Sequence, residues 1–174
     1  MPLPRIAVRS DAKALSILAE RTFRETFAAD NKAADMDLYC SQSYNEAVQA
    51  AEIDALNMTT FVRGDGAGFA GFAQVSWASA PACVEADSPG EIRRFYVLAA
   101  WHGRGIAQEL MTACLDAFHQ RGTDVAWLGV WERNPRAIAF YGKCGFAAVG
   151  EHAFTLGTDV QRDIIMARPL ARRG

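Results

Sequence analysis

The sequence has few metal-ligating residues, and they are scattered. Its 174 residues include four cysteines, at positions 40, 83, 114 and 144, and three histidines, at positions 102, 119 and 152. No Cys-x-x-Cys pair occurs, and the histidines show no ligand spacing. These patterns predict no metal site. The isolated cysteines are typical of reduced thiols, so we expect a cytoplasmic protein.

Long apolar runs and an excess of one charge are absent as well. No apolar segment approaches the ~18 residues of a membrane-spanning helix, and the first residues lack the charged and apolar parts of a signal peptide. The formal net charge is only −2, whereas non-specific binding to nucleic acid needs a strongly basic face. We therefore expect neither a membrane nor a nucleic acid as a partner.

The composition is that of a globular protein. Hydrophobic residues make up 51% and charged residues 22% of the chain, which excludes a disordered protein. The length suits a single domain over residues 1–174. Strands with helices between them, and antiparallel hairpins near both ends, predict an α/β protein with a mixed sheet.

The apolar patterns also place the elements. Strands are predicted at residues 4–9, 58–63, 69–77, 91–97, 125–131, 146–154 and 160–170. Helices are predicted from Ser10, as N-cap, to about residue 28, over 44–56 with Ser43 as cap, from 106 to about 120, and from Pro135 to about 143. In the helix over 44–56, Val48, Ala51 and Leu56 should face inward. A helical turn is expected at residues 36–40.

The stretch EIRRFYVLAAWHGRGIAQELMTACLDAF, residues 91–118, organises the chain. It predicts a strand at 91–97, a glycine turn at 102–107 and then a helix. Such a turn forms an anion cradle, because the glycines let the backbone approach a ligand and the free amides of the first helical turn point at it. A simple strand-to-helix connection is the alternative interpretation of the same glycines.

Two familiar phosphate motifs do not fit this turn. A nucleoside triphosphatase loop needs Lys and Ser/Thr after the last glycine, and neither follows Gly105. In the dinucleotide fingerprint, Gly103 and Gly105 match, but the third glycine is replaced by Gln108. The pattern that fits is Gln/Arg-x-x-Gly-x-Gly/Ala, with His102 in the first place and Ala107 in the last. In this turn the chain resembles the GCN5-related N-acetyltransferases (GNAT), from which His102 departs mildly.

A second motif, WLGVWERNPRAIAFYGKCGF, carries the same resemblance through Asn134, Tyr141, Gly145 and Phe146. The resemblance implies acetyl-CoA as co-substrate, with its pyrophosphate in the glycine turn and its pantetheine arm beside Asn134. It also implies that Tyr141 protonates the departing thiolate, as a phenol with a pKa of about 10 can do. The implied cofactor-binding residues are Phe95, Tyr96, Val97, Gly103, Arg104, Gly105, Ile106, Ala107, Gln108, Asn134 and Lys143.

Three further segments, RTFRETFAADN, LGVWERNPRAIAFY and FTLGTDVQRDIIM, are similar to the PaiA branch of this superfamily. That branch implies a small polyamine such as spermidine or spermine as acceptor. A peptide or protein N-terminus, and a non-catalytic acyl-CoA-binding regulator, are the alternatives. Candidate acceptor contacts are Asp30, Asp35, Asp37 and Tyr39. The protein could form a homodimer.

The resemblance also implies a fold and a mechanism. The GNAT fold has a mixed, mostly antiparallel sheet with splayed central strands and flanking helices. The amine should attack the thioester directly, with a backbone N–H near Val97 polarising the carbonyl. Cys114 and Cys144 lack a His base at any readable spacing and are poor nucleophile candidates. Glu91 is a candidate for the base that removes the ammonium proton, and a water chain is the alternative.

Overall fold

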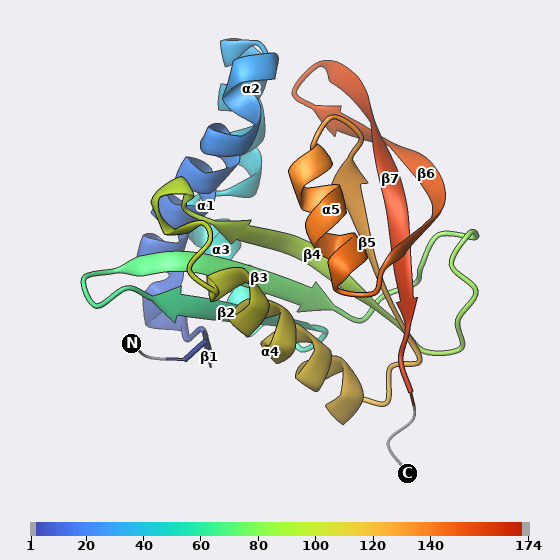
Figure 1. The fold of residues 1–174 in the computed structure, drawn as a ribbon. Coiled ribbons are helices and arrows are strands. Elements are labelled where there is room, and N and C mark those ends of the chain that lie inside the picture. Colours follow the sequence, from blue (N-terminus) through green and yellow to red (C-terminus); the bar gives the residue numbers. More distant parts are fainter. Residues whose placement is uncertain (1–2, 172–174) are drawn as a thin grey trace.

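A computed structural model describes residues 3–171 and shows one seven-stranded sheet in the order β1-β2-β3-β4-β5-β7-β6 (Figure 1). The strands are β1 (Arg5–Ile6), β2 (Met58–Gly64), β3 (Phe69–Ser76), β4 (Pro89–Val97), β5 (Val125–Trp131), β6 (Ala147–Leu156) and β7 (Asp159–Pro169). The helices are α1 (Ala12–Phe27), α2 (Ala33–Ser43), α3 (Glu46–Asp54), α4 (Ile106–Gln120) and α5 (Pro135–Lys143). Short 3₁₀ turns lie at Arg9–Asp11, Ala28–Asp30 and Ala99–Trp101.

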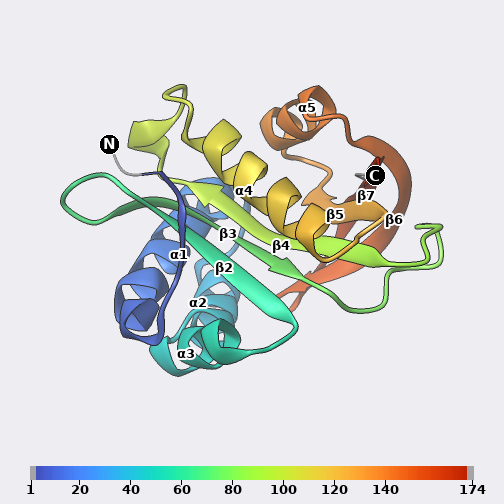
Figure 2. The ribbon, with the colours of Figure 1, turned by 90° about the horizontal axis from the view of Figure 1, so that it is seen from below.

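The helices form two layers, one on each face of the sheet. Helices α1, α2 and α3 cover one face, and α4 and α5 cover the other (Figure 2). The first face packs Leu15, Leu18 and Phe23 of α1 against Phe72 of β3. The second packs Leu110 and Cys114 of α4, among others, against the central strands. The sheet therefore has an apolar core on each side.

The central strands β4 and β5 pair for only part of their length. All other neighbouring strands are antiparallel, but β4 and β5 are parallel and pair only from Pro89–Val125 to Glu91–Trp127. Beyond Glu91 the two strands diverge, as Figure 1 shows. Arg93 is an extra residue in the β3–β4 ladder, a bulge of the kind that bends a strand. The predicted α/β fold with splayed central strands is confirmed.

The N-terminal boundaries differ from the prediction. The strand expected over residues 4–9 ends at Ile6, and a 3₁₀ turn follows at Arg9–Asp11. The carboxylate of Asp11 causes the turn, because its Oδ2 accepts a hydrogen bond from Val8 N at 2.8 Å. Ser10 therefore lies inside this turn and is not the N-cap of α1.

The region between α1 and β2 also differs. The helical turn expected at 36–40 is part of the longer α2. Helix α3 begins at Glu46 because Asn45, not Ser43, is its cap, with Oδ1 accepting from Val48 N at 2.9 Å. Leu56 lies beyond the helix and is 91% exposed, whereas Gln49 is buried and donates to Ser43 O. The inward face predicted for this helix was therefore wrong for Ala51 and Leu56.

Within residues 3–171, none of the helices has the length and apolarity needed to cross a membrane.

Candidate active site

A single cavity occupies the gap between β4 and β5. Its volume is about 950 Å³. It is lined by residues from both strands, from the start of α4, from α5, and, on the other face of the sheet, from α1, α2, β6 and β7. The cavity therefore reaches both faces of the sheet through the splay.

The glycine turn lies at one end of this cavity. Gly103 and Gly105 have φ values of +75° and +84°, and a Cβ at either position would meet no atom within 4 Å. Glycine is thus required by backbone conformation and not by crowding. Helical hydrogen bonding begins at Glu109 N, which donates to Gly105 O, so the preceding amides of α4 are oriented toward the cavity mouth. This geometry suits a pyrophosphate.

The edge of β4 supplies two further amides. Leu98 N donates to Ala70 O on β3 at 2.8 Å, so the amide of Val97 points to the opposite edge of the strand, into the splay. The amide of Phe95, two residues earlier, points the same way. The carbonyl of Val97 contacts His102 Nε2 at 2.8 Å, which ties the glycine turn to the end of β4. An extended ligand arm could pair with this edge as a short strand would.

Asn134 and Tyr141 line the same side of the cavity from α5. Asn134 caps the helix through Oδ1, which accepts from Ala137 N at 3.2 Å, so a ligand contact would come from its Nδ2 donor. Pro135 stands at the first helical position, as predicted.

Tyr141 is buried in an aromatic cluster. Its ring contacts Phe95, Phe140 and Phe146 at centroid distances of 6.0, 5.6 and 6.1 Å. Burial raises the pKa of this phenol above its usual value, and the nearby Cys114 and Cys144 act in the same direction. Tyr141 therefore holds its proton throughout the physiological pH range and can act only as an acid.

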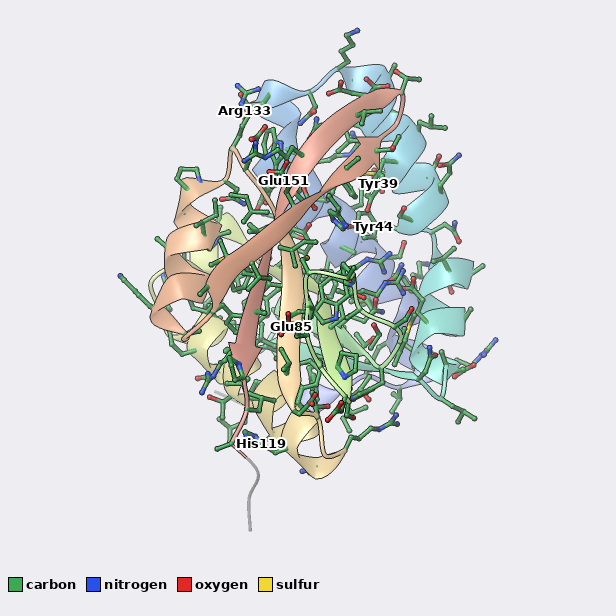
Figure 3. The ribbon with its side chains drawn as sticks, turned by 90° about the vertical axis from the view of Figure 1, so that its right-hand side faces the viewer. Tyr39, Tyr44, Glu85, His119, Arg133 and Glu151 are labelled. Carbon is green, nitrogen blue, oxygen red and sulfur yellow. The ribbon has the colours of Figure 1, made fainter. Side chains whose placement is uncertain are left out.

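On the other face of the sheet the cavity opens into an aromatic chamber. Tyr96 follows Phe95 and points the opposite way, since neighbouring residues of a strand face opposite sides. Its ring lies 6.4 Å from that of Phe23 and 5.8 Å from that of Phe72. The chamber walls also include Phe27, Tyr39, Tyr44, Trp131 and Phe154. In Figure 3, Tyr39 and Tyr44 mark the part of this wall that α2 and its C-terminal end supply.

Glu91 lies in this chamber at the narrow end of the splay. Burial raises the pKa of its carboxyl, while Arg93, a hydrogen bond from Ser76 and the more distant His152 oppose the rise. Arg94 also faces the chamber, with its guanidinium over the Tyr44 ring and paired with Glu52. Arg93 lies 3.6 Å from the same Glu52 carboxylate. Glu52 thus offsets much of the positive charge beside Glu91.

Comparison with known proteins decides the family. The sequence matches the acetyltransferase (GNAT) family over residues 17–146. The chain belongs to this family. It is an acetyl-CoA-dependent N-acetyltransferase, as the sequence motifs predicted.

A relative agrees with this assignment, and solved structures share the fold. The chain is 32% identical, over 88% of both chains, to an uncharacterized N-acetyltransferase in the pepI 3′ region of Lactobacillus delbrueckii subsp. lactis. It resembles in fold the PaiA N-acetyltransferase from Thermoplasma acidophilum, solved in complex with coenzyme A, with a TM-score of 0.80, 19% identity and coverage of 98% and 100%. The ribosomal-protein-S18-alanine N-acetyltransferase from Escherichia coli shares the fold with a TM-score of 0.70, 19% identity and coverage of 100% and 97%.

Most of the predicted cofactor residues of this GNAT enzyme lie together at the cavity. The lining includes Phe95, Tyr96, Val97, Gly103, Gly105, Ile106, Ala107, Gln108 and Asn134. Tyr96 lines it from the chamber side. Two predicted residues lie outside the lining: the guanidinium of Arg104 stacks over Trp101 at 5.0 Å, and Lys143 is exposed at the end of α5.

The predicted acidic acceptor contacts do not line the cavity, although Tyr39 does. Asp35 is buried and accepts hydrogen bonds from the amide and hydroxyl of Thr158, at 2.8 and 2.6 Å. Asp37 pairs with Arg24, and Asp30 lies 3.7 Å from Arg133. These carboxylates hold structural contacts around the chamber, which is why their position in the sequence was a poor guide to substrate binding.

Sequence reasoning missed one polar pair of the chamber, His152 on β6 and Asp163 on β7. The two residues lie directly opposite each other in the β6–β7 ladder, and both line the cavity. The alternation of the two strands could have indicated a shared face, but only the register brings them together. Among the described residues no group of three or more His, Cys, Asp or Glu side chains could hold a metal ion.

Proposed function

We propose that this GNAT enzyme transfers the acetyl group of acetyl-CoA directly to the primary amine of a small cationic acceptor, with polyamines such as spermidine and spermine as the first candidates. The observation that carries the proposal is the continuity of the cavity through the splay. Acetyl-CoA would lie along the glycine turn, the β4 edge and Asn134. The amine would enter from the aromatic chamber on the opposite face.

The chamber suits an ammonium group for two reasons. The rings of Tyr39 and Tyr96 line the chamber and can attract a cation, an interaction worth about 0.5–2 kcal/mol per well-placed ring, whereas the Tyr44 ring already carries the Arg94 guanidinium. Glu91 and Asp163 add carboxylates to the chamber lining. The positive charges of Arg93 and Arg94 are turned toward Glu52 and do not oppose an incoming amine as free cations would.

The two proton transfers of the proposed reaction take place on opposite faces of the sheet. Tyr141 stands on the α5 side with Phe95 and would donate a proton to the departing thiolate. The ammonium proton would leave on the chamber side, where Glu91, the base predicted from sequence, adds negative charge beside the amine. The amide of Val97 would polarise the thioester carbonyl between them. An acyl-enzyme is not needed, since burial raises the pKa of both Cys114 and Cys144 and keeps them as thiols.

An acceptor panel with detection of released thiol tests the proposal. Acetyl-CoA is held constant and spermidine, spermine, a monoamine of equal length, and a peptide with a free N-terminus are compared. We expect turnover with the polyamines and a much lower kcat/KM with the monoamine. Turnover with the peptide alone would move the acceptor class to protein N-termini. Absence of thiol release with every amine would reject the proposed transfer altogether.

We further propose that this activity belongs to a reducing compartment, the cytoplasm, and the four unpaired thiols support this proposal.

A further inference from the structure

His152 and Asp163 form an unusual polar pair on the chamber face of the β6–β7 hairpin. Asp163 lies opposite both His152 on β6 and Trp131 on β5. Residues directly opposite in a ladder share a face, and Trp131 contacts Phe27 of α1 with a centroid distance of 5.2 Å. The pair therefore points to the α1 side of the sheet, where the aromatic chamber lies. Figure 3 marks Glu151, the residue before His152, on this hairpin.

Gly129 of β5 leaves an opening beside the pair. A Cβ at this position would lie 3.2 Å from His152 Nε2 and 3.3 Å from Asp163 Oδ2. The φ of Gly129 does not require glycine, so here the missing side chain matters for space. Gly129 is two residues beyond Trp127, the last residue of β5 that pairs with β4. The opening is therefore located where the splay has begun to widen.

The pair has unused capacity for a ligand. His152 Nε2 and Asp163 Oδ2 are 3.7 Å apart, too far for a direct hydrogen bond but close enough for a charge interaction. Asp163 is only 9% exposed, and its Oδ1 is buried with no hydrogen-bond partner among the described residues. A buried carboxylate oxygen without a donor is costly, so the Asp163 carboxylate gains from any added donor. Its other oxygen, Oδ2, lies 3.3 Å from the Cβ position of Gly129, and an ammonium group at the opening would donate to that oxygen.

Resting on the proposed function, we propose that the His152–Asp163 pair receives the ammonium group of the acceptor and that His152 takes its proton. Asp163 holds the ammonium and then stabilises the imidazolium that forms beside it. His152 is 41% exposed on its side chain, so the proton can pass on to solvent. Glu91 contributes negative charge at the narrow end of the splay, and the transfer itself belongs to His152.

Groups on both faces of the sheet take part in the proton transfers of the proposed reaction. The ammonium nitrogen loses one proton to His152 and then attacks the thioester carbon, forming the C–N bond. As the C–S bond breaks, Tyr141 protonates the sulfur. After the attack the nitrogen loses a second proton. In the overall balance, this proton replaces the one that Tyr141 gave to the sulfur. The net release is one proton per acetyl transfer, and it leaves on the chamber side.

Other charged and titratable groups surround the pair. Glu91, Arg93 and Arg94 of β4 and Tyr39 of α2 line the same chamber, and the charge of His152 acts on Glu91. Cys83 of the 77–88 loop lies against Gly150, two residues before His152. Arg162 and Glu151 belong to the other face of the hairpin and pair with each other at 3.0 Å. Burial raises the pKa of Asp163, and the positive charge of protonated His152 opposes the rise. Proton uptake by His152 thus favours the ionised form of Asp163.

The test compares His152→Gln with the parent across pH, using spermidine or whichever panel amine turns over. Glutamine can hydrogen bond but cannot take a proton, so kcat/KM for the amine should fall about 10²–10⁴-fold at pH 7. The loss should shrink toward pH 10, where an amine with a pKa of about 10 deprotonates unaided. The Kd of acetyl-CoA should stay unchanged. His119→Gln is the matched control, because His119 lies on α4 and does not line the cavity.

Gly129→Ala tests the opening while both side chains of the pair are kept, with its Cβ 3.2 Å from His152 Nε2 and 3.3 Å from Asp163 Oδ2. Its methyl group would occupy the proposed ammonium position, so amine kcat/KM should fall while acetyl-CoA binding and Tm are retained. Unchanged amine kinetics in a folded Gly129→Ala or His152→Gln protein overturns the inference. A loss of equal size at pH 7 and pH 10 does so too, because it marks a structural role. If Glu91→Gln removes the pH dependence instead, the base is Glu91. A parent enzyme that binds acetyl-CoA but acetylates no amine refutes the proposed function itself.

Discussion

At Tyr141, packing and chemistry can be separated by one substitution. Tyr141→Phe keeps the ring against Phe95, Phe140 and Phe146 but removes the proton. General acids contribute about 10²–10⁴-fold, so kcat should fall by roughly that factor. The KM of acetyl-CoA should change little, because the lost contact forms mainly in the transition state. Steady-state kinetics beside the melting temperature measure both effects. A normally folded variant with the parent kcat would remove Tyr141 from the mechanism.

Gly105 offers a residue-scale test of the cradle. Gly105→Val should weaken acetyl-CoA binding about tenfold or more, because a β-branched residue at φ +84° costs about 1–2 kcal/mol or forces the turn to move. Calorimetric titration with acetyl-CoA measures the change.

Gly66→Val is the matched control for this strain. Gly66 has φ +97°, also with open space around it, but lies in the β2–β3 hairpin and not in the cavity lining. It should lose comparable stability and keep the parent affinity for acetyl-CoA. Equal affinity in both valine variants would mean that the cofactor does not use the glycine turn.

At the scale of elements, the carboxylate of Asp35 links α2 to the β6–β7 turn through hydrogen bonds. Asp35 accepts two hydrogen bonds from Thr158, and a Cβ on Gly157 would come within 2.5 Å of Asp35. The same α2 carries Tyr39, whose ring lies 5.5 Å from that of Phe154 on β6. We therefore infer that the Asp35–Thr158 contact sets the width of the aromatic chamber.

Asp35→Ala should lower the melting temperature and raise the KM of the amine, with little change in the Kd of acetyl-CoA. The hydrogen bonds from Thr158 lower the pKa of Asp35 below its usual value. A lowered pKa in the folded state stabilises the fold at neutral pH, and this stabilisation is lost as pH falls through the folded-state pKa. The difference in unfolding free energy between parent and variant should therefore shrink on acidification. Urea titrations between pH 7 and pH 3 measure it, and a difference that grows would contradict the assignment.

Sequence patterns predicted the elements that have strong local signals. The apolar run of β5, the Asn134-Pro135 start of α5 and the Gly103–Gly105 turn all lie where they were expected. The boundaries near Asp11 and Asn45 were wrong, because side-chain caps there outweighed the hydrophobic pattern. The proposed cofactor side could be predicted because two continuous stretches, residues 91–118 and 127–146, supply it. The acceptor side could not be predicted, because β4, β6, β7 and α2 are far apart in the sequence and meet there only in the folded structure.

At the scale of the whole molecule, both substrates must occupy the cavity together. Burial raises the pKa of Cys114 and Cys144 and keeps them as thiols, and the proposed acid and base lie on opposite faces of the sheet. Initial-velocity plots should therefore give intersecting lines, the pattern of a ternary complex. Labelled coenzyme A should not exchange into acetyl-CoA when the amine is left out. Parallel lines together with such exchange would show a covalent acetyl-enzyme and contradict direct transfer.

The gap between β4 and β5 also limits the shape of the acceptor near its reacting nitrogen. Only the acetyl group and the attacking nitrogen have to meet in the gap between β4 and β5. In the proposed binding mode, whatever is attached to that nitrogen stays on the side of α1 and α2, where these helices and the β6–β7 hairpin form the walls. The gap therefore selects for an unhindered amine, whereas the bulk and length of the rest of the acceptor are set by α2 and the β6–β7 hairpin. Substitutions in those two elements could change the acceptor while the acetyl-donor side stays as it is.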